Sequence, residues 1–303
     1  MSNPPLSRAS DFDPEVLRLF DQYVHGVIDR RGFLAGAARF AAGAGGAAGL
    51  LAALNPKFAT AQQVRPDDPR LSTRHIEFAS PKGYGKARGY LARPSKAEPA
   101  LPLVLVAHEN RGLNPHIEDI ARRLALDGFI AFAPDALCPL GGYPGDEDAA
   151  RALFAKLDQA TTREDFLAAT DWLGRLPGGN GRIGAVGFCW GGGIVNFLAT
   201  QRPQLAAAAP FYGMAPPAAE VANIKAELLV VLAADDARIN SGWPACEAAL
   251  KAAGVRYTLY QPAGTQHGFN NDTTPRYDKA AAGEAWRRTI ALFDRTLRVG
   301  RHA

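Results

Sequence analysis

The feature that most constrains the fold of this chain is a repeated alternation of apolar runs and helix-like segments after about residue 100. The run "LPLVLVAHE" is almost wholly apolar, which is typical of a strand buried on both faces. It is followed by "HIEDIARRLALDG", in which Ile117, Ile120 and Leu124 recur at helical spacing and Gly128 marks a stop. Repeated strand–helix units predict a mostly parallel sheet with helices on both faces, which is an α/β fold.

The same pattern predicts the remaining elements. Two β-like runs, "RHIEFAS" and "ARGYLARP", flank "PKGYGK", whose glycines suit a tight turn, so an N-terminal antiparallel hairpin is expected. Further strands are predicted at 129–135, 181–188, 206–213, 226–235 and 256–263, and further helices at 146–158, 163–176, 192–201, 242–254 and 280–297.

Reactive side chains follow four of the predicted strands, and ligands bind at the carboxyl ends of strands in such sheets. These side chains are His108 and Glu109, then Cys189, then Asp235 and Asp236, and finally His267. The order cysteine, aspartate, histidine matches the nucleophile–acid–base order of the α/β-hydrolase fold.

Cys189 is the predicted nucleophile because "GFCWG" fits the G-x-nucleophile-x-G turn between a strand and a helix. Glycines leave room for a sharp turn, and the positive end of the following helix favours a thiolate. An inert buried cysteine is the alternative for a lone Cys. His267 in "GTQHGF" is the predicted general base. Asp235 and Asp236 compete to orient it.

The oxyanion of the reaction should be held by backbone N–H groups rather than by side chains. One donor is expected from Trp190, directly after the nucleophile, and the other near Asn110, in the loop after an earlier strand.

Four segments carry a family resemblance over about Leu71 to Leu297. The motifs "GFCWGG", "DARIN" and "GTQHGF", with "HENRGLNPHIEDIARRLALDGFIAFAPD", resemble the dienelactone hydrolase family. The resemblance implies an α/β-hydrolase fold and a triad of Cys189, Asp236 and His267. It also implies that Glu109 interacts with the thiol at rest, and a nearby carboxylate opposes thiolate formation.

The resemblance implies hydrolysis of a small-molecule ester or lactone with neither a metal nor an organic cofactor. The archetype has an arginine for the substrate carboxylate where this chain has Asn271, and Arg238 and Arg276 are the nearby candidates. The rival hypotheses are a non-catalytic binding module and a redox-sensing thiol protein. A serine esterase is disfavoured because no serine occupies the turn.

Composition excludes several other classes. The net charge is +4 with scattered basic residues, so no nucleic-acid partner is expected. The three cysteines are far apart in the chain, which argues against a zinc site or a disulfide framework.

The N-terminal residues 1–61 are predicted to be a leader, 62–70 a linker and 71–303 the catalytic domain. Arg30 and Arg31, an Ala- and Gly-rich stretch and "ATA" at 59–61 resemble a twin-arginine export signal. We therefore expect the export machinery as a partner, a periplasmic product and no stable membrane span. A retained leader and a cytoplasmic protein are the alternative. An amphipathic helix near Val16 to Val24 could engage a partner.

Overall fold

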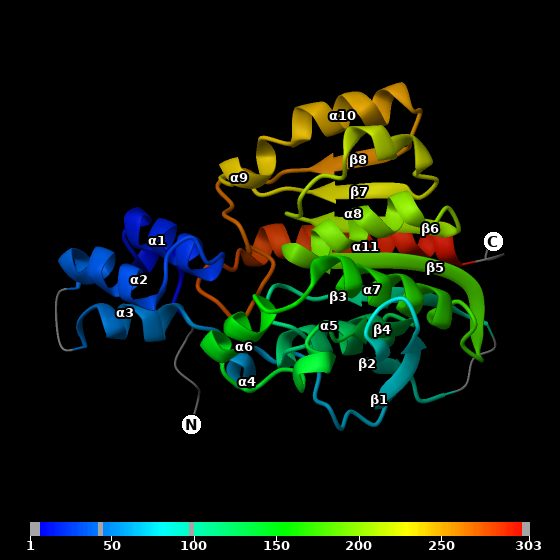
Figure 1. The fold of residues 1–303 in the computed structure, drawn as a ribbon, viewed down its shortest axis with the longest axis horizontal. Helices are drawn as coiled ribbons and strands as arrows, with labels where there is room; N and C mark the ends of the chain where they lie inside the picture. The colour runs from blue at the N-terminus through cyan, green and yellow to red at the C-terminus, as the bar shows by residue number, and fades with distance from the viewer. Residues whose placement is uncertain (1–6, 42–44, 97–99, 299–303) are drawn as a thin grey trace.

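The computed structural model describes residues 7–41, 45–96 and 100–298. Its centre is one eight-stranded sheet with the strand order β1-β2-β4-β3-β5-β6-β7-β8 (Figure 1). β2 pairs antiparallel with β1 and β4, and the other neighbouring strands are parallel. The strands are β1 Leu71–Ser80, β2 Gly85–Pro94, β3 Leu101–Ala107, β4 Ile130–Pro134, β5 Gly179–Phe188, β6 Leu205–Phe211, β7 Glu227–Val231 and β8 Tyr257–Tyr260. The predicted α/β-hydrolase fold and its N-terminal hairpin are confirmed.

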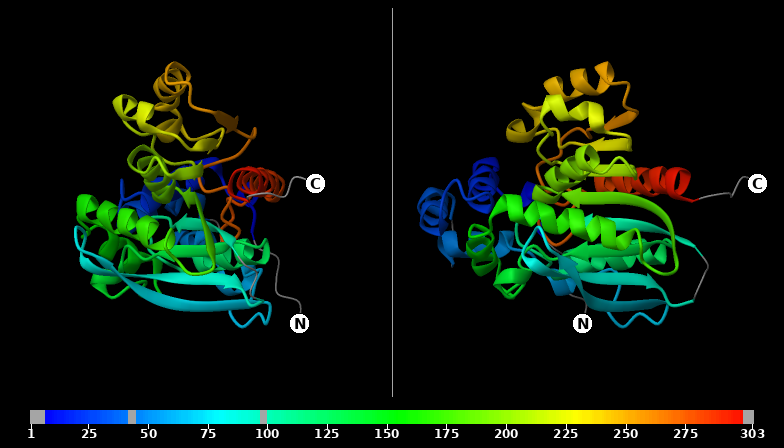
Figure 2. Two further views of the ribbon diagram at one scale, coloured as in Figure 1. Left: turned by 90° about the vertical axis from the view of Figure 1, so that its right-hand side faces the viewer. Right: turned by 45° about the vertical axis from the view of Figure 1, so that its right-hand side comes forward.

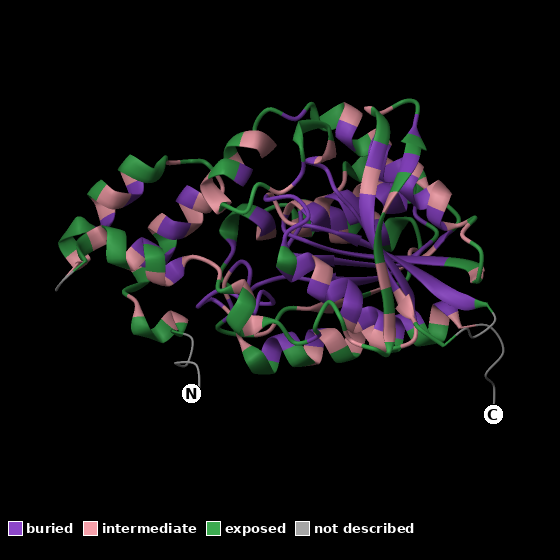
Figure 3. Ribbon diagram, turned by 90° about the horizontal axis from the view of Figure 1, so that it is seen from below, coloured by how far each residue is buried: buried purple, intermediate pink, exposed green. Residues whose placement is uncertain are grey.

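Helices cover both faces of the sheet and bury its apolar strands (Figure 3). The core on one face includes α5 (Pro115–Leu126) and α11 (Lys279–Leu297). The core on the other includes α7 (Gln159–Leu173), α8 (Trp190–Gln201) and α10 (Trp243–Ala252). β3 is buried along its whole length, as its unbroken apolar sequence predicts. The shorter elements are α6 Glu147–Phe154, α9 Ala237–Asn240 and the 3-10 turns Ala9–Asp11, Ala38–Phe40, Cys138–Leu140 and Ala218–Asn223.

Local signals in the sequence explain where α5 begins and ends. The Asn114 side chain accepts a hydrogen bond from the Ile117 backbone N–H at 3.2 Å, which caps the helix, and Pro115 follows at the first helical position. Beyond its end, Gly128 has φ +82°, a left-handed conformation that glycine adopts readily. This helix therefore delivers the chain from the end of β3 back to the start of β4.

The residues before β1 form a helical segment with a small core of its own. We call residues 7–61 the N-terminal segment; it contains α1 (Pro14–Val24), α2 (Arg30–Ala37), α3 (Gly46–Leu54) and α4 (Phe58–Ala61). Its buried cluster includes Phe20, Tyr23 and Phe33. α1–α3 form a lobe on the side of the sheet toward which β7 and β8 point, and the two views in Figure 2 agree on this placement (Figures 1 and 2). No helix within the described ranges is both long and apolar enough to cross a membrane.

The residues predicted as a linker are packed against the catalytic domain. Val64 is buried, and its backbone N–H donates to Asp119 at 2.8 Å. The buried Arg122 side chain donates to the Val64 carbonyl at 2.8 Å. These contacts tie the chain between α4 and β1 to helix α5.

Candidate active site

Cys189 stands in a strained turn between β5 and α8. Its backbone has φ 55° and ψ −115°, a conformation that few non-glycine residues adopt. A Cβ placed on Gly187 would lie 2.3 Å from the carbonyl oxygen of Gly191, and one on Gly191 would lie 2.2 Å from that of Ala107. Both glycines are therefore required by close backbone contact. This is the geometry that the "GFCWG" motif predicts for a nucleophile turn.

His267 and Asp236 form a buried pair. His267 Nδ1 lies 2.5 Å from Asp236 Oδ2, and both side chains are almost fully buried. Asp235, the competitor, is exposed, and its backbone pairs with the loop that carries Gln266. The geometry therefore favours Asp236 as the residue that orients the imidazole. His267 Nε2 is buried with no hydrogen-bond partner among the described residues.

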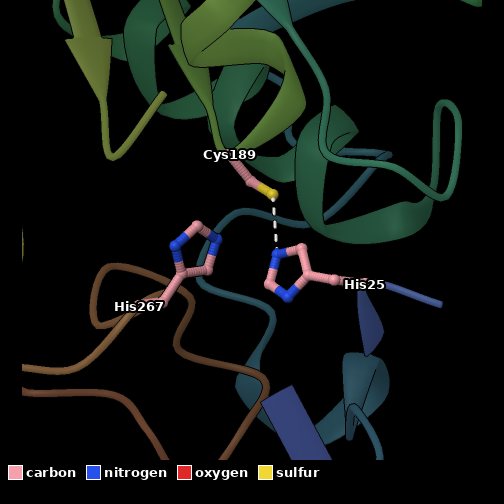
Figure 4. Close-up of side chains that lie close together, drawn as sticks. All are labelled: His25, Cys189 and His267. Carbon is pink, nitrogen blue, oxygen red and sulfur yellow. Dashed lines mark hydrogen bonds between the residues drawn. The ribbon is translucent and has the colours of Figure 1, made fainter. Parts of the chain in front are cut away.

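The Cys189 thiol forms its hydrogen bond with a histidine that was not among the predicted site residues. Cys189 Sγ lies 3.5 Å from Nε2 of His25, which directly follows α1 (Figure 4). The His25 and His267 rings meet edge to face, with centroids 4.7 Å apart. The ligand atoms of Cys189, His25 and His267 all lie within 4.8 Å of one another. The sulfur therefore lies next to two imidazoles.

These surroundings favour the charged forms of all three groups. Burial raises the pKa of the Cys189 thiol, but His267 and His25 outweigh it and lower that pKa to about 5. Burial lowers the pKa of His25, but Asp21 and Cys189 raise it to about 10. For His267, burial lowers the pKa, and Cys189 and Asp236 raise it above its ordinary value. A thiolate between imidazolium groups is the state this arrangement supports.

Glu109 lies at the site but is held by another residue. It lines a small cavity of about 40 Å³ together with Cys189 and His267. Its Oε2 accepts a hydrogen bond from Asn271 Nδ2 at 2.8 Å. Asn271 stands where the archetype has an arginine, so this position secures Glu109 here.

The two residues predicted to supply oxyanion donors lie near Cys189: Trp190 follows it in the chain, and Asn110 lines both cavities that reach it. Trp190 is the first residue of α8, where backbone N–H groups lack partners within the helix. Its ring stacks on His108 with centroids 5.2 Å apart. Asn110 follows β3, and its side chain donates to the Val24 carbonyl at 3.0 Å.

A second, larger cavity also reaches Cys189. Its volume is about 730 Å³, and Val24, His25 and Gly26 of the N-terminal segment line it together with Cys189 and other catalytic-domain residues. Aromatic and apolar side chains of the catalytic domain in this cavity include Trp190, Phe197 and Met214. A small-molecule substrate can therefore approach the thiol while the N-terminal segment is docked.

The two candidate arginines both contact the N-terminal segment. Arg276 Nη1 lies 3.2 Å from Asp21 Oδ1, and the Arg276 guanidinium stacks over the Phe20 ring at 5.3 Å. Arg238 Nη2 lies 3.0 Å from His25 Nε2. Each guanidinium group therefore has a polar partner in the N-terminal segment.

The same three side chains that hold the sulfur could ligate a metal ion. A thiolate and two imidazole nitrogens are ligands that zinc prefers, and their spacing suits one ion. A metal bound here would occupy the sulfur lone pair that a nucleophilic attack by Cys189 would use.

Local sequence patterns could not have identified His25. The amphipathic spacing correctly predicted α1, in which Val16, Leu17 and Phe20 are buried, but it gave no reason to bring the end of α1 to the nucleophile. Only the docking of the segment places His25 there.

Comparison with known proteins separates the chain into the same two parts. The model of the dienelactone hydrolase family matches residues 87–297, and a model described as YqhI-like matches residues 4–42. "Putative carboxymethylenebutenolidase" of Salmonella typhi is 34% identical over 221 residues, which is 67% of this chain and 81% of that protein. "Putative hydrolase fragment YghX" of Escherichia coli (strain K12) is 50% identical over 105 residues, which is 35% of this chain and 90% of that protein.

A solved structure agrees with the sequence relatives. The crystal structure of a "Putative Dienelactone Hydrolase" from Klebsiella pneumoniae subsp. pneumoniae MGH 78578 is 30% identical to this chain, with a TM-score of 0.65. The match covers 98% of that chain but 73% of this one. With the match of the family model to most of the catalytic domain, these findings show that the chain belongs to the dienelactone hydrolase family.

Proposed function

We propose that this protein is a cysteine hydrolase of esters or lactones, with Cys189 as nucleophile, His267 as acid–base and Asp236 orienting His267. Family membership makes the chain a hydrolase, and the carboxymethylenebutenolidase relatives suggest ester or lactone substrates. The observation that carries the proposal is the position of the sulfur in a strained strand–helix turn beside the buried His267–Asp236 pair.

The reaction follows from these positions. The thiolate attacks the carbonyl carbon, the C–S bond forms, and the carbonyl electrons move to the oxygen, which the backbone N–H groups of Trp190 and Asn110 stabilise. When the tetrahedral intermediate collapses, the C–O bond breaks and the alkoxide takes a proton from His267. Water then attacks the thioester, His267 takes its proton, and the acid leaves as the C–S bond breaks.

Glu109 is proposed to oppose, in part, the activation of the Cys189 sulfur by His25 and His267 before substrate arrives. It lines the small cavity beside the sulfur, and its carboxylate opposes negative charge there. Its hydrogen bond with Asn271 would keep it in place until substrate enters.

The experiment is hydrolysis of p-nitrophenyl acetate by the full chain and by Cys189→Ala. We expect the variant to lose at least about a thousandfold in kcat/KM, as for removal of other catalytic nucleophiles. Cys246→Ala is the matched control, because Cys246 lies on the buried face of α10, and this variant should keep full activity. Activity that survives Cys189→Ala would refute the proposal.

The fate of the N-terminal segment is a separate proposal. The twin-arginine pattern predicts export and cleavage after Ala61, but Arg30 pairs with Asp148 at 2.8 Å and Phe33 is buried. The contact between His25 and Cys189 favours the alternative, in which the segment is retained. N-terminal sequencing of protein from periplasmic and cytoplasmic fractions tests this. Protein that begins after Ala61 would contradict retention.

A further inference from the structure

The N-terminal segment lies outside the part of the chain that makes the family fold. The dienelactone hydrolase model begins at residue 87, and the Klebsiella structure is matched almost completely by 73% of this chain. All eight strands of the sheet follow residue 70. The N-terminal segment is therefore an addition to a family fold that is complete without it.

The segment is docked by specific polar contacts at the carboxyl end of α1. Carbonyl groups in the last turn of a helix lack partners within the helix and carry partial negative charge. The Val24 carbonyl accepts from Asn110 Nδ2 at 3.0 Å and from Arg111 Nη2 at 3.2 Å. The Tyr23 carbonyl accepts from Arg151 Nη1 at 2.7 Å, and the Arg151 guanidinium lies 4.1 Å from the Tyr23 ring centroid. The catalytic domain thus fixes the helix end that carries His25.

His25 is oriented by its own acidic residue. Its Nδ1 lies 2.8 Å from the Asp21 carbonyl oxygen and 3.3 Å from Asp21 Oδ1, so this nitrogen faces acceptors only and carries a proton. Nε2 is then the atom that faces the sulfur. The thiol consequently lies between two acid-supported imidazoles, His25 with Asp21 and His267 with Asp236.

Two groups compete for Nε2 of His25. In the neutral ring this nitrogen accepts a hydrogen bond from Arg238, at 3.0 Å. In the charged ring it donates to the sulfur, and the cation of Arg238 opposes that form. Asp21 and a Cys189 thiolate favour the charged ring of His25, whereas the neighbouring His267 opposes it when His267 is itself charged. Because Arg238 is exposed and its side chain can move, the buried contact with sulfur is the better supported one.

We infer that His25 is a catalytic residue of this enzyme, donating its Nε2–H to the Cys189 thiolate, and that the docked N-terminal segment completes the active site. The inference rests on the proposed function, because it assumes that Cys189 is the nucleophile. His25 holds the negative sulfur before attack, and His267 remains the group that exchanges protons with the leaving group and water. Cys189 lines the cavity of about 730 Å³ together with His25, so the sulfur is reachable by substrate while the segment is docked.

The test measures the pH dependence of Cys189 alkylation by iodoacetamide, with kcat/KM for p-nitrophenyl acetate, in the full chain and in His25→Gln. We expect the apparent pKa of alkylation to be higher in His25→Gln than in the full chain by at least about one unit. At a pH below both pKa values, this is a tenfold lower alkylation rate. His75→Gln is the matched control, since His75 is half exposed on β1 and pairs with Glu118. It should leave the profile unchanged.

A second variant separates the lost imidazole from altered docking. We expect added imidazole to restore part of the alkylation rate and activity of His25→Ala, and to have no effect on His75→Ala. An unshifted alkylation profile in His25→Gln, or no restoration of His25→Ala by imidazole, would overturn the inference. A failure of the proposed function is distinguishable, because it would appear as activity that survives Cys189→Ala in the chain with His25 intact.

Discussion

Asp21 and Arg276, 255 residues apart in the chain, form an ion pair at 3.2 Å, and Arg276 lines the small cavity that also reaches Cys189. Arg276 is almost fully buried, and the small cavity next to it has a volume of about 40 Å³. The pair therefore neutralises the cation that could otherwise receive a substrate carboxylate.

From this pair we predict a preference for uncharged substrates. The kcat/KM for p-nitrophenyl butyrate should exceed that for the p-nitrophenyl monoester of succinic acid by about tenfold, or ~1.4 kcal/mol. Asp21→Asn should narrow this ratio because it frees Arg276, while the exposed Asp67→Asn should not change it. A wild-type preference for the anionic ester would contradict the prediction.

Asp236 and Asp235 can be distinguished by the same amide substitution. Asp236→Asn should lower kcat by at least about a hundredfold, because the amide no longer favours the required tautomer and charge of His267. Asp235→Asn should keep nearly full activity, since that side chain is exposed. Steady-state kinetics with matched thermal unfolding curves would check this, and equal losses in both variants would count against the assignment.

The three thiols should differ sharply in reactivity. Burial raises the pKa of Cys138 and Cys246, whereas His267 and His25 lower that of Cys189 to about 5. Iodoacetamide at pH 6 should therefore modify Cys189 first. The rate of this modification should fall as the pH drops through about 5, because the thiolate gains a proton there. Peptide mass mapping over time measures this; similar rates at all three cysteines would argue against an activated thiol.

Gly187 should tolerate no side chain. A Cβ at this position would lie 2.3 Å from the Gly191 carbonyl oxygen, so Gly187→Ala must displace the backbone. We expect a loss of at least about 1–3 kcal/mol in unfolding free energy, with loss of activity. Gly283→Ala in α11 has no atom within 4 Å of the added carbon and should be neutral or stabilising by ~1 kcal/mol. Thermal unfolding of both variants tests the contrast, which equal melting temperatures would disprove.

Zinc should inhibit the enzyme reversibly. The donor atoms of Cys189, His25 and His267 lie within 4.8 Å of one another, so one ion can take all three. Addition of EDTA should restore activity, and His25→Gln should raise the zinc concentration needed for half inhibition by about tenfold or more, as expected when one ligand is lost. Unchanged zinc sensitivity in that variant would show that His25 is not a ligand.

The sequence predicted the sheet and the strand ends because those features depend on short periodic patterns and on chain order. Buried strands such as β3 are apolar without interruption, and a nucleophile turn needs glycine at Gly187 and Gly191. The antiparallel pairing of β2 with β4 was not predicted, because neighbouring strands in the sheet are not neighbours in the chain.

Other parts of the site depend on tertiary contacts alone. Asp235 and Asp236 are adjacent in sequence, and burial against His267 distinguishes them. His25 has no local signal, since its contact with Cys189 joins residues 164 positions apart. The Ala-rich composition that suggested an export signal is equally compatible with the small helical core around Phe33.

The contact between α1 and the catalytic domain also sets an order of assembly. Residues near the N-terminus leave the ribosome first, yet His25 and Asp21 need partners at Cys189 and Arg276 that are made much later. Helix α1 is therefore synthesised well before the residues that dock it, and it cannot dock until they are made. Until α1 docks, Cys189 lacks the His25 imidazole, so the proposed activation of its sulfur requires the docked segment.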